Sequence, residues 1–159
     1  MKFSLFNILF FTLFCFCSHS QAVKTTSVPL RVVIYDESVN PPLSLKETQL
    51  LKEVYGTHLF KEILDRPNRL LFMKELLRNR IQVMKIANIK DQKKSKLLSE
   101  FPLFNAFVPE LERDLIFDPQ NFNPLKYNLP FYGIGLGTVL CRIDGTDYFI
   151  FIKSQHYKR

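Results

Sequence analysis

Two short runs of apolar and β-branched residues near the C-terminal end of the chain predict a β-hairpin. They span residues 137–143 and 146–153, and an Asp-Gly pair separates them. Such a two-residue connection is a strong hairpin signal, because Asp-Gly suits the tight turns whose twist matches that of the strands. In this register Cys141 lies opposite Tyr148, and both faces of the hairpin are apolar. We therefore expect other parts of the chain to cover both faces.

Apolar residues recur at helical spacing in the second quarter of the chain. Ser44 and Glu47 match a capping box, in which each side chain bonds a free backbone amide of the first turn. Gly56 either ends this helix, with a second short helix beginning at Thr57, or lies within one continuous helix. Pro67 suits the first turn of the next helix, where its missing N–H needs no partner. The predicted buried stripes are Leu50, Leu51, Val54 and Tyr55 in the first helix and Leu70, Leu71, Met73, Leu76 and Leu77 in the last.

Two further segments have the composition of strands, and one long segment shows no periodic pattern of apolar residues. Residues 30–35 and 81–86 are the predicted strands. Residues 96–136 contain five prolines, which exclude a long helix, and many Phe, Leu and Tyr side chains, which need burial. We predict an α+β fold with a small, mostly antiparallel sheet of about four strands that includes the C-terminal β-hairpin. Two or three helices pack on one face, and the long, ordered Pro- and Phe-rich loop partly covers the other.

The N-terminal residues 1–22 have the pattern of a secretory signal peptide. A lysine precedes an apolar stretch over residues 3–17, and small residues follow it up to Ala22. The apolar stretch is shorter than the roughly 20 residues that cross a bilayer, so cleavage after Ala22 is favoured over a retained signal anchor. We therefore predict an exported protein of the periplasm or the extracellular space, with no transmembrane span after cleavage.

Three cysteines bear on the form of the exported chain. Cys15 and Cys17 lack the preceding small-residue pattern that lipid attachment requires, so a lipid-anchored form is also less favoured. Cleavage leaves only Cys141, which cannot form an internal disulfide, and the fold must then depend on its core. We expect a flexible lead-in over residues 23–29 and a single domain over residues 30–159.

The chain is basic, with a formal net charge of +7. Such a charge favours weak attraction to anionic surfaces, and solubility explains it equally well. Nucleic-acid binding normally adds aromatic platforms or an inserting helix to a basic cluster, and neither accompanies the lysines here. We therefore predict no nucleic-acid partner, and we expect an envelope component or another protein instead. The clustered lysines are Lys90, Lys93, Lys94 and Lys96.

One local group of carboxylates could support hydrolysis or hold calcium. Paired carboxylates perform glycoside hydrolysis, but Arg113 lies within this group and no calcium-loop spacing is present. We favour a solvated turn before a short strand at residues 115–117 over a catalytic site. The carboxylates are Glu110, Glu112, Asp114 and Asp118.

No other constellation predicts catalysis, a cofactor or a metal. Cys141 could be paired with His58 or His156 as nucleophile and base, but it lies within an apolar strand, where a thiol is inert. The glycines of residues 133–137 precede a strand and lack the lysine of a phosphate-binding loop. We therefore predict no catalytic residues, no cofactor and no metal site.

Two phrases in the last 40 or so residues carry a resemblance. They are Phe122-Asn123-Pro124-Leu125-Lys126-Tyr127-Asn128 and the turn Arg142-Ile143-Asp144-Gly145-Thr146-Asp147-Tyr148 with its following strand and Lys153-Ser154-Gln155. Together they resemble the C-terminal parts of small exported bacterial proteins of uncharacterised function. The resemblance implies export and implies no activity, cofactor or site.

Three functional hypotheses follow. The leading one is an exported, non-enzymatic structural or binding module that uses the loop of residues 118–132 as its contact surface. The alternatives are an envelope hydrolase that uses the carboxylates of residues 110–118, and association with an anionic surface through residues 90–96. For the leading hypothesis, the predicted binding residues are Phe122, Asn123, Tyr127, Asn128 and Tyr132.

Overall fold

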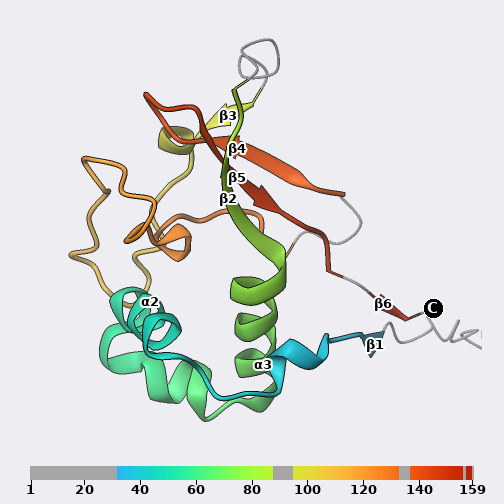
Figure 1. The fold of residues 1–159 in the computed structure, drawn as a ribbon. Coiled ribbons are helices and arrows are strands. Elements are labelled where there is room, and N and C mark those ends of the chain that lie inside the picture. Colours follow the sequence, from blue (N-terminus) through green and yellow to red (C-terminus); the bar gives the residue numbers. More distant parts are fainter. Residues whose placement is uncertain (1–31, 88–94, 133–136, 156, 159) are drawn as a thin grey trace, which may run out of the picture. The chain divides into compact units, whose positions relative to one another are not determined.

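The computed structural model describes residues 32–87, 95–132, 137–155 and 157–158 (Figure 1). Several sequence predictions fall outside these ranges. They are the signal peptide of residues 1–22, the lead-in of residues 23–29, Lys90, Lys93, Lys94, the glycine-containing residues 133–136, and His156.

The main sheet has four strands in the order β2-β5-β4-β3. β2 (Ile81–Lys85) and β4 (Val139–Arg142) both pair antiparallel with β5 (Tyr148–Ile152), and β3 (Lys96–Leu97) pairs parallel with β4. Two antiparallel pairings out of three confirm the predicted α+β fold with a mostly antiparallel sheet. β5 is the inner strand that its unbroken apolar run requires.

The β4–β5 hairpin forms, but its predicted register is wrong by two residues. Cys141 lies opposite Ile150 rather than Tyr148. The N–H of Ile143 donates to the carbonyl of Tyr148 over 2.9 Å, so four residues connect the strands instead of two. A shift of two leaves each side chain on its predicted face, because side chains alternate with a period of two.

The chemistry of the turn explains the longer connection. The two-residue turn that suits Asp-Gly needs positive φ at both central residues. Gly145 has a positive φ of 67°. Asp144 does not, and neither does any other described residue that is not glycine. The Asp144 carboxylate instead accepts hydrogen bonds from the backbone N–H and the hydroxyl of Ser99, at 2.9 and 2.6 Å. Thr146 completes the loop, because its hydroxyl donates to the carbonyl of Ile143.

The first predicted strand does not join the main sheet. β1 (Val32–Val33) pairs antiparallel with β6 (Tyr157–Lys158) in a separate two-stranded sheet, and β3 supplies the fourth strand of the main sheet. The strand is short because Asp36 begins a 3₁₀ turn, accepting a hydrogen bond from the N–H of Ser38 at 2.8 Å. β2 pairs with β5 over five residues, so the side of β5 away from β4 is not open to β1.

Both main helices begin where the sequence predicts. The capping box of α2 (Leu45–Tyr55) is confirmed, since Ser44 Oγ accepts from the N–H of Glu47 and Glu47 Oε2 accepts from the N–H of Ser44. Gly56, with φ 53°, ends α2, and a 3₁₀ turn and a π-helical turn (Phe60–Leu64) follow. The second helical segment is therefore separate. Pro67 begins α3 (Pro67–Glu75) as predicted.

α3 continues through a π-helical turn, Leu76–Arg80, directly into β2 (Figure 1). Because no reversing loop separates helix from strand, α3 extends beyond the end of β2 instead of folding back flat on the sheet. A space remains between the helices and the sheet, and another part of the chain fills it.

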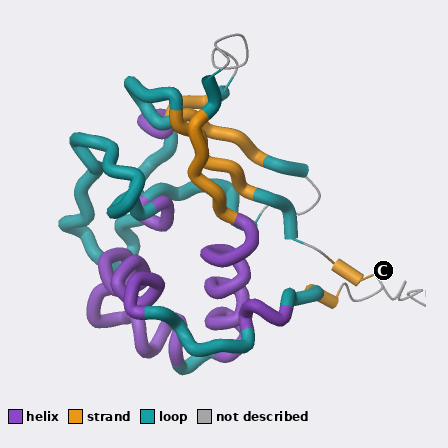
Figure 2. Tube along the Cα trace, in the orientation of Figure 1, coloured by secondary structure: helices purple, strands orange, loops and turns teal. Residues whose placement is uncertain are grey.

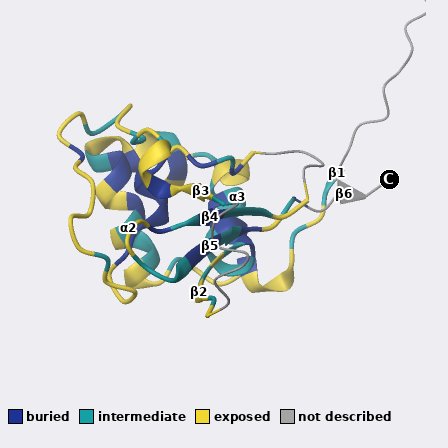
Figure 3. Cartoon of the chain, turned by 90° about the horizontal axis from the view of Figure 1, so that it is seen from above, coloured by how far each residue is buried: buried dark blue, intermediate teal, exposed yellow. Residues whose placement is uncertain are grey.

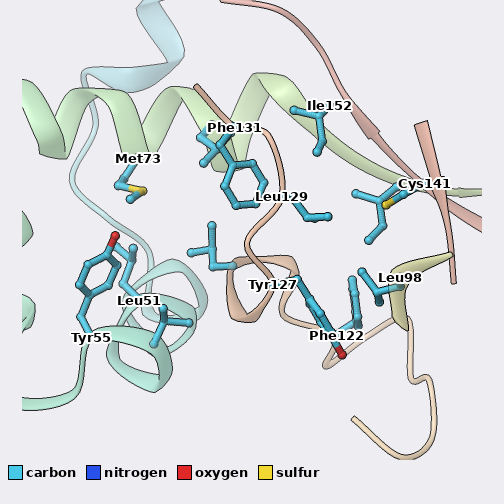
Figure 4. Packing of buried hydrophobic residues seen from close by; sticks show 14 of the residues in the cluster. Leu51, Tyr55, Met73, Leu98, Phe122, Tyr127, Leu129, Phe131, Cys141 and Ile152 are labelled. Carbon is cyan, nitrogen blue, oxygen red and sulfur yellow. The ribbon is translucent and has the colours of Figure 1, made fainter. Parts of the chain in front are cut away.

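That part is the long loop, residues 98–132, which is almost entirely irregular (Figure 2). Figure 4 shows Tyr127 and Leu129 of this loop between Leu51 of α2 and Cys141 of β4. These residues belong to one core cluster with Ile150. The loop therefore forms a middle layer between helices and sheet, and its apolar side chains are buried as the sequence requires.

The described part of the loop packs on the same face of the sheet as the helices, so the prediction that it covers the opposite face is wrong for these residues. Cys141, Ile150 and Ile152 face the core, whereas Phe149 is buried on the opposite face, next to the partly exposed Met84. In Figure 1 the described helices and loop lie on one side of the sheet. The helices bury the stripe that faces this core and expose their other side (Figure 3).

An ion pair joins α2 to the end of the α3 segment. Arg78 Nε and Nη2 donate to the two carboxylate oxygens of Glu47 at 2.6 and 2.7 Å, and the guanidinium also donates to the carbonyls of Ser38, Pro41 and Pro42. The hydrogen bonds from Arg78 lower the pKa of Glu47 from 4.5 to about 2. The Glu47 carboxylate therefore stabilises the fold above pH 4.5, and this contribution disappears as the pH falls through 2.

We expect the Glu47→Gln variant to lose about 1 to 2 kcal/mol of unfolding free energy at pH 7, after solvent screening is allowed for. Between pH 5 and pH 2 its stability should fall less steeply than that of the wild type, because the titrating group is gone. Urea unfolding at several pH values measures both effects. Glu112→Gln, at an exposed position, is the control, and equal pH slopes for wild type and Glu47→Gln would contradict the assignment.

Candidate functional site

Three of the five predicted binding residues lie inside the fold. Phe122, Asn123 and Tyr127 are 8%, 1% and 2% exposed. The Asn123 side-chain amide donates to the carbonyl of Leu50 at 2.9 Å, and its Oδ1 accepts from the N–H of Leu125 at 3.0 Å. Burial of this kind ties the long loop to α2. Only the remaining two residues are available at the surface, Asn128 and the 70% exposed Tyr132.

The predicted carboxylates do not converge. Glu110 and Glu112 are exposed, and the Asp118 carboxylate stabilises its own turn by accepting from the N–H of Gln120 at 2.9 Å, which lowers the pKa of Asp118. Asp114 instead bonds Lys126 Nζ at 2.6 Å.

Asp114 and its surroundings form a hollow of about 240 Å³ that also includes Arg113 and Ser99. Glu110 and Glu112 do not line this hollow. The predicted strand at residues 115–117 is absent from the structure, and Leu115 and Ile116 are 99% and 85% exposed in a bend.

Cys141 lies in the core, fully buried, and burial raises the pKa of its thiol to about 12. His58 is exposed, and its ring contacts Phe107 with 5.5 Å between centroids. In the described part of the chain, no three His, Cys, Asp or Glu residues are grouped as a metal would require. Within the same residues, no helix has the length and apolar character that a membrane span needs.

A groove beside α3, of about 520 Å³, combines polar and aromatic groups. This volume is within the range of small-ligand sites. We call it the aromatic groove. Its described lining residues are Tyr35, Tyr55, Ile63, Asn68, Arg69, Phe72, Met73, Phe104, Phe107 and Tyr132.

Secondary structure positions these side chains from three directions. α3 places Asn68, Arg69 and Phe72 along one wall. The last residue of α2, Tyr55, contacts Phe107 of the long loop with 5.1 Å between ring centroids. Because the helices and the loop are held by one core, these walls are parts of the same packed unit.

Tyr132 forms an exposed platform at the groove. Its ring stacks on Phe72, with centroids 4.7 Å apart and planes 5° apart. Arg80 lies 5.5 Å from the centre of the same Phe72 ring. Stacking holds Tyr132 although most of its surface is in solvent, and tyrosine has a large contact area with few rotatable bonds.

Tyr55 provides a hydroxyl in the groove. The residue is 5% exposed, and Figure 4 shows its hydroxyl directed toward Met73, which also lines the groove. Burial raises the pKa of Tyr55 to about 12, with a further contribution from Tyr132, so the phenol keeps its proton at neutral pH. The described residues offer its hydroxyl no hydrogen-bond acceptor. Among these residues the fully buried side-chain atom without a partner is Gln155 Nε2, so the Tyr55 hydroxyl reaches solvent in the groove and is available to a ligand.

Charge at the groove comes from a small arginine cluster. Glu62 accepts from Arg69 Nη1 at 2.7 Å and forms an ion pair with Arg66 at 3.2 Å. Because Arg66 and Arg69 share the single carboxylate of Glu62, the cluster has a net charge of about +1. Arg69 lines the groove, whereas Arg66 does not.

The sequence identified only Tyr132 among these residues. The available signal was the aromatic content shared by the long loop and the two helices. Periodicity assigned Tyr55 to a buried stripe and the loop phenylalanines to a cover, and it could not show that these rings meet around an opening.

No family model, curated protein or solved structure matches the chain.

Proposed function

We propose that the chain is an exported, non-enzymatic binding module that holds its ligand in the aromatic groove. The observation that carries this proposal is a groove of ligand size with a mostly aromatic lining, in which the Tyr55 hydroxyl has no hydrogen-bond partner among the described residues. A ligand in the groove can therefore accept a hydrogen bond from this hydroxyl. The long loop takes part in binding through Tyr132.

The composition of the lining supports binding over catalysis. Six of its described residues are aromatic, and Arg69 is the one with a formal charge at neutral pH. Binding sites combine mostly apolar walls with a few polar groups that orient the ligand. A hydrolase would need a nucleophile or an acid–base pair, and the described lining includes neither.

A fragment screen by NMR tests the proposal. The ¹⁵N-labelled domain is titrated with a set of neutral, anionic and cationic aromatic fragments and simple sugars. We expect at least one class to shift the amides of residues 68–73 and 104–107. Tyr132→Ala should weaken that binding by about tenfold, because the stacking platform is lost.

Phe60→Ala is the matched control for this screen. Phe60 is 66% exposed, nearly as much as Tyr132, and it does not line the groove. Its loss should leave binding unchanged. Absence of groove shifts with every fragment class, in a domain that remains folded, would overturn the proposed function.

A further inference from the structure

The hydrogen bonds of Arg69 to Glu62 use only one of its three nitrogen atoms. Its Nη1 donates to the carboxylate and, at 3.3 Å, to the backbone carbonyl of Glu62. Its Nε and Nη2 have no acceptor among the described residues, and its side chain is 52% exposed. An arginine held by one nitrogen keeps a fixed position while its other N–H groups remain available, which suits binding of a carboxylate or similar group.

The Tyr55 hydroxyl adds a second donor in the same groove. Tyr55 and Arg69 both line the groove, so one ligand in it can contact both groups. Both are donors at neutral pH. An anionic acceptor satisfies both, whereas a cationic group would face the excess positive charge of the arginine cluster.

The aromatic lining of the groove favours a flat ligand body. Tyr132 and Phe72 form a parallel stack at one side of the groove, and Phe104 and Phe107 line it as well. A smaller apolar cavity of about 40 Å³ shares Tyr55, Phe104 and Tyr132 with the groove. Aromatic surfaces in offset or edge contact with a ring stabilise planar groups beyond the effect of burial alone.

We infer that the ligand is a planar, ring-containing organic anion, whose ring packs against Tyr132 and whose anionic group binds Arg69 and the Tyr55 hydroxyl. This inference rests on the proposed function and adds the chemical class of the ligand. A neutral sugar or an apolar ring has no anionic acceptor for the free N–H groups of Arg69, which then stay hydrogen-bonded to water. An anion gains charge-assisted hydrogen bonds there, which are about twice as strong as neutral ones.

Three probes of nearly the same shape test the inference: 2-naphthoate, 2-naphthamide and 2-naphthylmethylammonium. Their affinities are measured by NMR titration of groove amides and by calorimetry. We expect 2-naphthoate to bind about tenfold more tightly than 2-naphthamide, a difference typical of one charge-assisted hydrogen bond, and the cation to bind most weakly. Arg69→Gln should reduce naphthoate binding about tenfold and change naphthamide binding less than about twofold.

Arg66→Gln separates direct contact from general electrostatics. It removes the same charge from the same acid partner, Glu62, at a position outside the groove. We expect it to weaken naphthoate binding less than about threefold. Thermal unfolding of both variants confirms that they fold.

The outcomes of the two experiments are distinguishable. Equal affinities for naphthoate and naphthamide in the groove would overturn the anionic class and leave the binding function in place. Equal losses from Arg66→Gln and Arg69→Gln would overturn the direct contact with Arg69. If none of the three probes shifts groove amides while another fragment class does, the ligand class is wrong and the binding function stands.

Discussion

Replacing Arg80 with methionine is expected to lower the free energy of unfolding by about 3 to 5 kcal/mol, a large loss for a single polar side chain. Arg80 is 2% exposed. Its Nε donates to the carbonyl of Lys153 at 2.8 Å, Nη1 to Oε1 of Gln155 at 2.9 Å, and Nη2 to the carbonyl of Phe131 at 2.7 Å. One side chain thus joins the start of β2, the end of the long loop and the segment after β5.

The loss follows from what the substitution leaves behind. Methionine fills most of the volume but donates to none of the three acceptors, and buried acceptors without partners are costly. Arg80→Lys should lose most of the same free energy, because one ammonium cannot reach acceptors in three directions.

Urea unfolding of wild type, Arg80→Met and Arg80→Lys measures these differences. Arg66→Met is the control, since Arg66 is 42% exposed and its ion pair with Glu62 is of the surface type, worth less than about 1 kcal/mol. A loss below about 1 kcal/mol for Arg80→Met would contradict a structural role for these hydrogen bonds.

The Asn123→Leu variant is expected to lose about 2 to 4 kcal/mol of unfolding free energy. The side chain is nearly isosteric, so the packing changes little. The N–H of Leu125 loses its partner, and the carbonyl of Leu50 and Oε2 of Glu53 lose the hydrogen bonds that they accept from the Asn123 amide at 2.9 and 2.8 Å. The attachment of the long loop to α2 is weakened as a result.

Asn128→Leu is the matched control, because Asn128 is an exposed asparagine of the same loop. Its unfolding free energy should change by less than about 0.5 kcal/mol. The pair also distinguishes structure from binding at a residue that the sequence predicted to be a contact. If Asn123→Leu keeps full stability and weakens ligand binding instead, Asn123 is a contact residue and the structural assignment is wrong.

Local chemistry made the helices and the hairpin predictable. The capping box at Ser44, the positive φ at Gly56 and the proline at the start of α3 each satisfy backbone groups within a few residues. Such features depend on near neighbours in the chain, and the sequence shows those neighbours directly. The predicted hairpin register was wrong because the turn also depends on a distant residue: Ser99 bonds Asp144 from 45 positions away in the chain.

The placement of the long loop depended on distant packing. Its apolar content correctly indicated burial, but two faces of the sheet were open to it. The direct passage from α3 into β2 decided between them by leaving space on the helical side. β3 was missed for a related reason, since two residues with an exposed lysine have no strand pattern of their own and are ordered by pairing with β4.

The candidate site was predictable only in part. Tyr132 was identified because exposed aromatic residues in a long loop suggest binding. Tyr127 and Phe122 have the same sequence character and are buried, and nothing local distinguishes them from Tyr132. Arg69 has the pattern of a solvated helix residue, and only the folded structure shows that it lines the same groove as Tyr55.

The middle layer also determines how the domain can fold. Leu129 and Phe131 lie between the helices and the sheet, so the helical segment and the hairpin gain much of their burial only when the loop is in place. We therefore expect neither part to be stable alone, because the loop has to close over long sequence separations before either is stabilised. We expect the irregular segment and the regular elements to become ordered together, at a rate that loop closure limits.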